Sequence, residues 1–456
     1  MPGLSPEPWT GLGAARAAGF SDAVSHASLT HGFIPIFIEL VTVVALLYAT
    51  GWRARRWRII SVPLAAAAGV VTGAAVHWYY GTLGIASEPA PWPMWLWVAL
   101  TGFAIAIAIV GWRSAGNWRR NASVFAVSFC LLSTGLTINS WLGYYPTVYA
   151  AWGQLADAPL PDETDLHGLK VLRHSAVTPT KGAVVPVRSG AEASGFRHRG
   201  EWVYLPPAWF TSVPPPQLPA VLMLGGEFNT PADWIRAGDA VATLDTFAAT
   251  HGGNAPVAVF ADATGGFTVD TECVNGVRGN AADHLSADLT REIDDLFGLG
   301  ARTRWGVVGF SSGGTCAVDL AVMHPGTFST FVDIGGDIAP SAGTRTQTIH
   351  RLFGGDANAW SSFDPSTVIV RHGKYTNLSG LFAVPGGRTP DGSKDRPQAV
   401  GQTAAESLCR LGAAHGIACE IVELPGKHDW PSAATAFETT LPWLAGQLGT
   451  PDSAAT

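Results

Sequence analysis

Four long apolar stretches dominate the first third of the chain, and the remainder alternates short apolar runs with longer mixed ones. The stretches cover residues 32–50, 59–79, 93–112 and 121–141. Each has about the 20 residues that a helix needs to cross a hydrocarbon core of about 30 Å. They are apolar on all sides, whereas helices at the surface of a water-soluble protein are amphipathic. The pattern therefore predicts an all-α domain of four transmembrane helices over residues 31–146.

The loops between these stretches differ in charge. Loop 80–92 contains Glu88 and no Lys or Arg. Positively charged loops stay on the cytoplasmic side, so this loop and both chain termini are expected outside. We therefore predict a multi-pass protein of the cell membrane, with residues 1–30 and the C-terminal domain extracytoplasmic. The arginines that place the first and third loops inside are Arg53, Arg55, Arg56, Arg58, Arg113, Arg119 and Arg120.

The pattern changes after a connector that we assign as a linker over residues 147–180. Near-continuous apolar runs such as 257–260 are typical of strands covered on both faces. Alternation of such strands with helices predicts a mostly parallel α/β sheet over residues 181–448, with ligands at the carboxyl ends of its strands. The tail 449–456 is small and polar, and we predict that it is disordered. The expected strands are 182–187, 201–205, 220–224, 256–261, 303–309, 330–334, 379–384 and 418–424, and the expected helices are 281–297, 315–324, 400–415 and 431–448.

Composition supports this division. Hydrophobic residues make up 47% of the chain and charged residues only 14%, which excludes a disordered protein and agrees with membrane segments. The net charge is −7 and the chain has no long basic run, so we expect no nucleic-acid partner. The 18 tryptophans fit a membrane protein, because indole rings favour the membrane–water interface.

The five cysteines divide between the two parts of the chain. Cys130 falls in the fourth apolar stretch, and the other four fall in the outer domain. Two disulfides are possible in an oxidising compartment, and four cysteines allow three pairings. From their positions relative to the expected elements we predict Cys273–Cys316 and Cys409–Cys419. No CxxC motif or Cys/His cluster is present, so we predict no zinc site.

The motif that carries chemistry is Gly309-Phe310-Ser311-Ser312-Gly313, between an expected strand and an expected helix. This is the G-x-S-x-G nucleophile elbow in the context that it requires. Ser311 must occupy a sharp turn that projects its hydroxyl from the sheet, and the glycines remove Cβ atoms that would clash there. We predict that Ser311 is a nucleophile and that the Ser312 N–H, at the helix N-terminus, is an oxyanion donor.

A serine nucleophile needs a base and an acid. His428 follows the last expected strand, where the base falls when the order is Ser, acid, His. His324 and His350 are rivals, but neither follows that strand, and His324 is better explained as a helix C-cap.

The acid is expected after strand 379–384, where Asp391 is our first choice and Asp395 our second. Asp337, after strand 330–334, is a third option. The second oxyanion donor should come from the loop after strand 220–224. We assign it to the backbone N–H of Gly226.

These residues resemble the esterase D-type branch of α/β-hydrolases, which includes secreted mycolyltransferases. The resemblance implies an α/β-hydrolase fold and a Ser–acid–His hydrolase or acyltransferase that needs no metal or other cofactor. The run 270–273 also looks family-like, and we interpret it as a structural or cleft loop tied by a disulfide to Cys316. The last histidine segment resembles that of multi-spanning actinobacterial putative esterases. The motifs that carry the resemblance, over about residues 181–448, are Trp202 to Pro207, Gly309 to Gly314, Met323 to Phe328, His428 to Trp430, and Leu441 to Leu444.

The sequence therefore predicts a membrane-anchored serine esterase or acyltransferase. Its substrate would be an ester-linked acyl group of a lipid or envelope glycolipid, because the tether places the site near lipid. No protein partner can be inferred. The rival hypothesis is a decayed hydrolase domain that serves as a membrane-anchored binding or scaffold protein. A small transporter is a third hypothesis, which four short spans with a single carboxylate do not favour.

Overall fold

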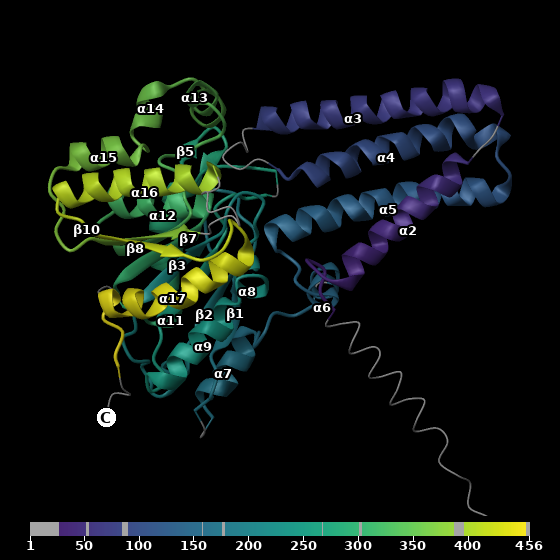
Figure 1. Ribbon diagram of the computed structural model, residues 1–456. Coiled ribbons are helices and arrows are strands. Elements are labelled where there is room, and N and C mark those ends of the chain that lie inside the picture. Colours follow the sequence, from purple (N-terminus) through teal and green to yellow (C-terminus); the bar gives the residue numbers. More distant parts are fainter. Residues whose placement is uncertain are drawn as a thin grey trace, which may run out of the picture. The chain divides into compact units, whose positions relative to one another are not determined.

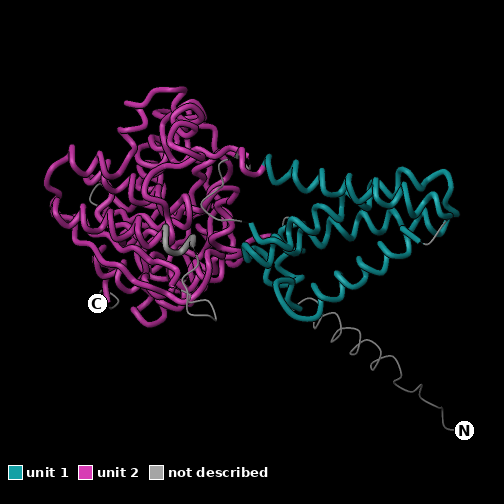
Figure 2. The backbone as a smooth tube through the Cα atoms, turned by 45° about the horizontal axis from the view of Figure 1, so that its top comes forward, with its two compact units in different colours: residues 1–79, 90–158 teal, residues 80–89, 159–456 magenta. Residues whose placement is uncertain are grey.

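The computed structural model (Figure 1) describes residues 27–51, 54–83, 90–156, 158–175, 178–266, 268–300, 303–386 and 396–452. Contacts divide the chain into two compact units, which Figure 2 shows in different colours. Unit 1 is Met1–Tyr79 with Ala90–Ala158, and unit 2 is Tyr80–Pro89 with Pro159–Thr456.

Unit 1 is helical and contains the four expected apolar helices. All four are long and apolar enough to cross a membrane. Thr42 and Ser133 join α2 to α5 through a buried hydrogen bond of 3.0 Å between their hydroxyls, the kind of contact that links helices within a bilayer. Large apolar side chains point outward, and that surface suits lipid rather than water. The helices are α2 (Phe33–Thr50), α3 (Val62–Leu83, after a π-turn Trp57–Ser61), α4 (Trp92–Gly111) and α5 (Asn117–Leu142).

The connector contains two short helices, which the prediction of a linker over residues 147–180 did not include. They are α6 (Val148–Leu155) and α7 (Leu166–Arg173). Each begins with a side-chain cap, because Thr147 accepts from the backbone of Ala150 and Asp165 accepts from that of Gly168. The caps stabilise helices that are too short to persist alone.

Unit 2 is built on an eight-stranded sheet in the order β1-β2-β4-β3-β7-β8-β9-β10. β1 and β2 are antiparallel to their neighbours, and the other strands are parallel. All eight expected strands are present, with ends shifted by at most two residues. The strands are β1 (Ala183–Val187), β2 (Glu201–Leu205), β3 (Ala220–Leu224), β4 (Val257–Ala261), β7 (Trp305–Phe310), β8 (Phe328–Ile334), β9 (Ser379–Pro385) and β10 (Ala418–Leu424).

Helices cover both faces of this sheet (Figure 1). One face carries α12 (Ser312–Met323), which packs on β7 and β8, and α16 (Arg396–Ala414), which packs on β9 and β10. The other face carries α17 (Trp430–Leu448) and α9 (Ala240–Thr250), which also contact each other. Fully buried strands such as β3 and β4 are apolar throughout because helices cover both of their faces.

Several short elements lie outside the sequence prediction. The segment between β8 and β9 folds into α13 (Arg345–Phe353), α14 (Ala357–Ser361) and α15 (Pro365–His372). Strands β5 (Asn275–Gly276) and β6 (Gly279–Asn280) form a small separate hairpin. Of the predicted disordered tail, residues 453–456 lie outside the described residues.

Both predicted disulfides are confirmed. Cys273–Cys316 joins the loop after β4 to the first half of α12, and Cys409–Cys419 joins α16 to β10. Cys130, in α5, is free and buried.

We predict that the two disulfides differ in their contribution to stability. They close loops of 43 and 10 residues, respectively. The chain-entropy relation gives about 4 kcal/mol for the longer loop and about 3 kcal/mol for the shorter one. Thermal unfolding of the two double-alanine variants in detergent should therefore show the larger loss for Cys273→Ala/Cys316→Ala. An equal or reversed order would contradict the loop-length explanation.

Candidate active site

Ser311 lies on the sharp turn between β7 and α12. Its backbone φ is 60° and its ψ is −126°, a combination that residues other than glycine rarely adopt. A Cβ on Gly309 would lie 1.7 Å from the carbonyl oxygen of Gly313, and a Cβ on Gly313 would lie 2.4 Å from that of Leu224. The two glycines are therefore required by the close approach of strand and helix, as the elbow motif demands.

His428 lies beside this turn, in the loop between β10 and α17. Its ring packs against the ring of Phe310, with centroids 4.8 Å apart. A Cβ on Gly335, which has a φ of 66°, would lie 3.0 Å from Nδ1 of His428. The backbone N–H of Ser311 in turn donates to the carbonyl of Ile334 at 3.0 Å. The structure thus gathers the residues flanking the elbow, the end of β8 and the predicted base at the carboxyl edge of the sheet.

The imidazole of His428 is held in its neutral form. Burial lowers its pKa to about 4, against a smaller rise from Asp429. Asp429 is engaged as the N-cap of α17, where it accepts hydrogen bonds from the backbone and the hydroxyl of Ser432. A neutral imidazole at neutral pH is the form that can accept a proton from a hydroxyl.

The candidate acids fall in two places. Asp391 and Asp395 lie outside the described residues. Asp337 lies after β8, where its backbone N–H donates to the Thr315 hydroxyl at 2.8 Å, and burial raises the pKa of its carboxyl. The charge of Asp337 in turn raises the pKa of two buried neighbours, Glu272 and Asp333. The rival His324 is the C-cap residue of α12.

The predicted oxyanion donors lie on either side of Ser311. Ser312 is the first residue of α12, so its backbone N–H belongs to the helix N-terminus. Gly226 approaches the elbow so closely that a Cβ there would lie 2.9 Å from Cβ of Ser311. This contact brings the loop after β3 against the nucleophile turn, as a two-donor oxyanion hole needs.

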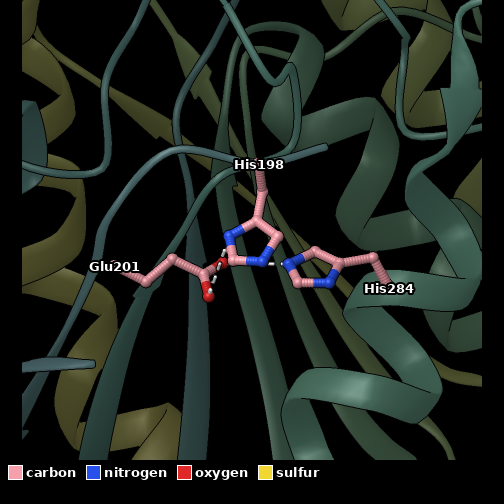
Figure 3. A group of neighbouring side chains, drawn as sticks. All are labelled: His198, Glu201 and His284. Carbon is pink, nitrogen blue, oxygen red and sulfur yellow. Dashed lines mark hydrogen bonds and ion pairs between the residues drawn. The ribbon is translucent and has the colours of Figure 1, made fainter. Parts of the chain in front are cut away.

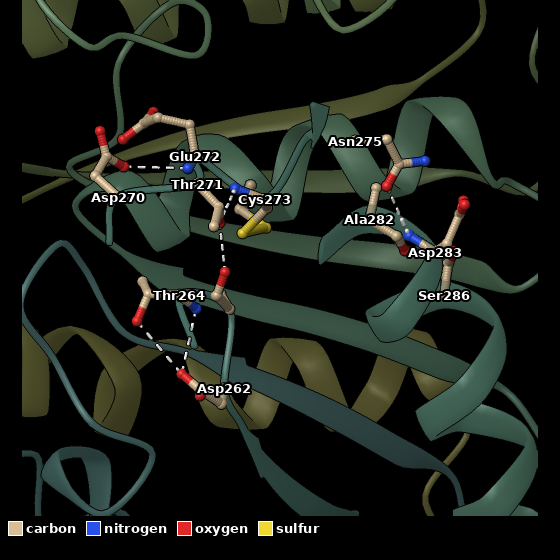
Figure 4. Close-up of a disulfide and its surroundings, with 12 residues drawn as sticks. Asp262, Thr264, Asp270, Thr271, Glu272, Cys273, Asn275, Ala282, Asp283 and Ser286 are labelled. Carbon is tan, nitrogen blue, oxygen red and sulfur yellow. Dashed lines mark hydrogen bonds between the residues drawn. A yellow bond between two sulfur atoms is a disulfide. The ribbon is translucent and has the colours of Figure 1, made fainter. Parts of the chain in front are cut away.

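A group of carboxyl groups surrounds this region. The pKa of Glu227 is raised to about 8, mainly by burial and also by the charge of Asp270, against a lowering by Arg278. Burial and Asp270 also hold the pKa of Glu272 well above its ordinary value. Figure 4 shows Asp270 and Glu272 beside the Cys273–Cys316 disulfide. The disulfide therefore holds an acidic loop at the elbow helix, which agrees with the interpretation of run 270–273 as part of the framework or cleft.

A second cluster lies at the start of β2 (Figure 3). His198, Glu201 and His284 present ligand atoms within 4.8 Å of one another, and these residue types suit Zn²⁺. However, Nδ1 of His198 lies 2.8 Å from the carbonyl of Arg199 and its Nε2 lies 3.1 Å from that of Ser189. Both ring nitrogens of His198 therefore already lie at hydrogen-bond distance from backbone carbonyls.

The fully buried Glu201 is instead the centre of a hydrogen-bond network. Its carboxylate accepts from the Ser189 hydroxyl at 2.5 Å, from the Asp262 backbone at 3.0 Å and from Nε2 of His284 at 3.1 Å. The sequence analysis missed this network. The signal was a charged residue at the first position of a buried strand, where a carboxyl group needs partners.

The fold and this geometry define an α/β-hydrolase: a mostly parallel sheet, a serine elbow and a histidine after the last strand. A match to the family described as "Putative esterase" covers residues 197–444, more than half of the chain. The chain belongs to this family. The protein is accordingly a serine carboxylic-ester hydrolase or acyltransferase.

The chain is also similar to an uncharacterised protein from Corynebacterium glutamicum. The two are 28% identical over 413 residues, which cover 86% of this chain and 90% of the other. Because 86% of the chain is more than residues 159–456, the similarity extends into the helical unit.

Solved structures similar to this chain include an esterase, a hydrolase and MPT51. A ferulic acid esterase is 14% identical, with a TM-score of 0.46, and the match covers 59% of this chain and 98% of that one. An S-formylglutathione hydrolase from Agrobacterium tumefaciens is 19% identical, with a TM-score of 0.42 and coverage of 60% and 99%. MPT51 from Mycobacterium tuberculosis is 20% identical, with a TM-score of 0.37 and coverage of 55% and 94%.

Gly309→Ala should destabilise unit 2 by about 3 kcal/mol, because the added methyl group overlaps a backbone carbonyl that cannot rotate away. Thermal unfolding measures the loss. The matched control is Gly446→Ala in α17, where a Cβ meets nothing within 4 Å. That change should leave stability unchanged or raise it by up to about 1 kcal/mol, since alanine is the better helix former. Equal melting temperatures for the two variants would contradict the steric explanation.

His428 should make stability depend on pH. Its pKa is about 4 in the folded chain, below the 6.5 of a free imidazole, so between these values the unfolded chain binds the proton more readily. The free energy of unfolding should therefore fall as the pH drops from 6.5 to 4, and His428→Gln should show a shallower fall. Denaturant titrations at several pH values measure this slope. The exposed His167→Gln is the control and should keep the wild-type slope.

Proposed function

We propose that the protein is a membrane-anchored serine esterase or acyltransferase, with Ser311 as nucleophile, His428 as general base and Asp391 as the acid that orients it. The observation that carries the proposal is the position of the neutral His428 imidazole beside the strained Ser311 turn. Strained backbone of this kind persists where the surrounding structure holds it, and it is concentrated at functional sites.

The reaction follows from these roles. His428 takes the proton of the Ser311 hydroxyl while the oxygen attacks the carbonyl carbon of an ester. The backbone N–H groups of Ser312 and Gly226 donate to the oxyanion that forms. His428 then gives its proton to the leaving alcohol, which departs as the acyl–Ser311 ester forms. Water or a second alcohol repeats the sequence in reverse and releases the acyl group as an acid or a new ester.

The proposed substrate is an ester of a lipid or an envelope glycolipid on the outer side of the membrane. Two features support this location. The four long apolar helices would hold the hydrolase domain at a bilayer. The two disulfides of unit 2 fit an oxidising compartment outside the cytoplasm.

A fluorophosphonate probe tests the nucleophile, because it reacts only with an activated serine. Full-length wild-type protein should label, and Ser311→Ala should not. Ser312→Ala is the matched control: it removes the neighbouring hydroxyl, keeps the backbone N–H, and should still label. Labelling of Ser311→Ala would refute the assignment. A folded wild type that never labels would favour the decayed hydrolase with a binding or scaffold role.

Substitutions of the three candidate aspartates in the full-length protein identify the catalytic acid. Asp391→Asn should lower kcat on a short-chain ester by about 10⁴-fold, because an amide fixes the wrong imidazole tautomer. Asp395→Asn and Asp337→Asn should each leave kcat within a few fold of wild type. A large loss in one of these instead would move the role to that residue. The lipid composition of envelope extracts from cells carrying Ser311→Ala should then show which ester accumulates.

A further inference from the structure

Arg199 stands at the edge of the sheet where the parallel strands end. β2 runs antiparallel to β4, so the chain enters β2 at the edge where β4, β3 and β7 finish. These four strands are adjacent in the order β2-β4-β3-β7. Arg199, two residues before β2, therefore shares this edge with Asp262 after β4, Asn229 after β3 and Ser311 after β7.

Arg199 and Asp262 form a closely bound pair. The backbone N–H of Arg199 donates to Oδ2 of Asp262 at 2.6 Å, and its Nε and Nη2 donate to Oδ2 at 3.1 Å and to Oδ1 at 2.6 Å. The Asp262 side chain is fully buried and that of Arg199 is 26% exposed. Burial alone would favour the neutral acid, but the contacts with Arg199 outweigh it and lower the pKa of Asp262. The guanidinium is thus fixed in one orientation.

The same guanidinium reaches the loop that carries the proposed oxyanion donor. Nη2 of Arg199 donates to the backbone carbonyl of Asn229 at 2.7 Å and to the Thr264 hydroxyl at 2.7 Å. The N–H of Asn229 donates to the carbonyl of Gly226 at 3.2 Å, which closes a turn over residues 226–229. A Cβ on Gly225 would lie 2.7 Å from Cβ of Asn229, so the turn is closely packed.

We propose that Arg199 is a positioning residue for the oxyanion hole: held by Asp262, it fixes the turn 226–229 and thereby the direction of the Gly226 N–H. This inference rests on the proposed function of Ser311 and Gly226. An oxyanion donor is effective only when it is already aimed at the developing charge. Lysine cannot replace Arg199, because an ammonium group lacks the planar fork that binds Asp262 and Asn229 together.

The test compares Arg199→Lys and Arg199→Met with wild type in the full-length protein, well below the melting transition. Arg199→Met should lower kcat on a short-chain ester by about 10- to 100-fold with KM within twofold, since misplaced transition-state groups cost up to about 100-fold. Arg199→Lys should not restore kcat. Hydrogen exchange of the amides in 225–230 should accelerate in both variants. The control, Arg197→Met, changes an exposed arginine two positions away and should match wild type.

A second variant guards against misfolding, because Arg199→Met leaves a buried carboxylate without its partner. Arg199→Met/Asp262→Asn removes both charges and should show the same loss of kcat and faster exchange. If the folded variants keep the wild-type kcat and the wild-type hydrogen exchange of residues 225–230, the positioning role of Arg199 is wrong, while the proposed function of Ser311 is unaffected. Faster hydrogen exchange with an unchanged kcat would show that Arg199 stabilises the turn 226–229 without affecting catalysis. A wild type that neither labels nor turns over ester would instead overturn the proposed function, and the catalytic role of Arg199 with it.

Discussion

Close backbone contact around Ser311 is the constraint on which the rest of unit 2 depends. A Cβ would clash at Gly309, at Gly313 and at Gly226, which belong to β7, α12 and the loop after β3. Without these Cβ atoms, the backbones of the three segments can come into contact at the nucleophile turn. The strained conformation of Ser311 persists because each neighbouring segment is itself held, by the parallel ladder, by the elbow helix or by the turn 226–229.

The buried carboxyl groups near the Ser311 turn are of two kinds. On the β2 side, Asp262 and Glu201 are buried with full sets of hydrogen-bond donors, and Arg199 keeps the pKa of Asp262 low. In the loops after β3 and β4, Glu227 and Glu272 have raised pKa values because burial and Asp270 disfavour further negative charge. Strongly hydrogen-bonded carboxylates therefore occur in the same region as carboxyl groups whose burial favours the protonated form.

The sequence was sufficient for features that depend on local pattern. Apolar length located the four helices of unit 1, and short apolar runs located all eight strands of the large sheet. The glycine spacing identified the Ser311 turn. Contacts between distant segments could not be predicted in this way. Nothing in the local pattern links Arg199 to Asn229, 30 residues away, or Glu201 to His284, 83 residues away. Their proximity follows from strand order, which only the fold reveals. Short capped helices such as α13 and α14 were missed because their hydrophobic repeat is brief.

The Cys273–Cys316 bridge has a practical consequence for work with this protein. One end is five residues from Ser311, and the other follows directly after Glu272. A chain produced in the cytosol of a common expression host would reach the folded state without this bond, because thiols stay reduced there. Preparations from such a source would differ covalently, at the elbow helix itself, from protein in which the bond has formed. Low turnover measured on them would describe the redox history of the sample rather than the competence of the enzyme.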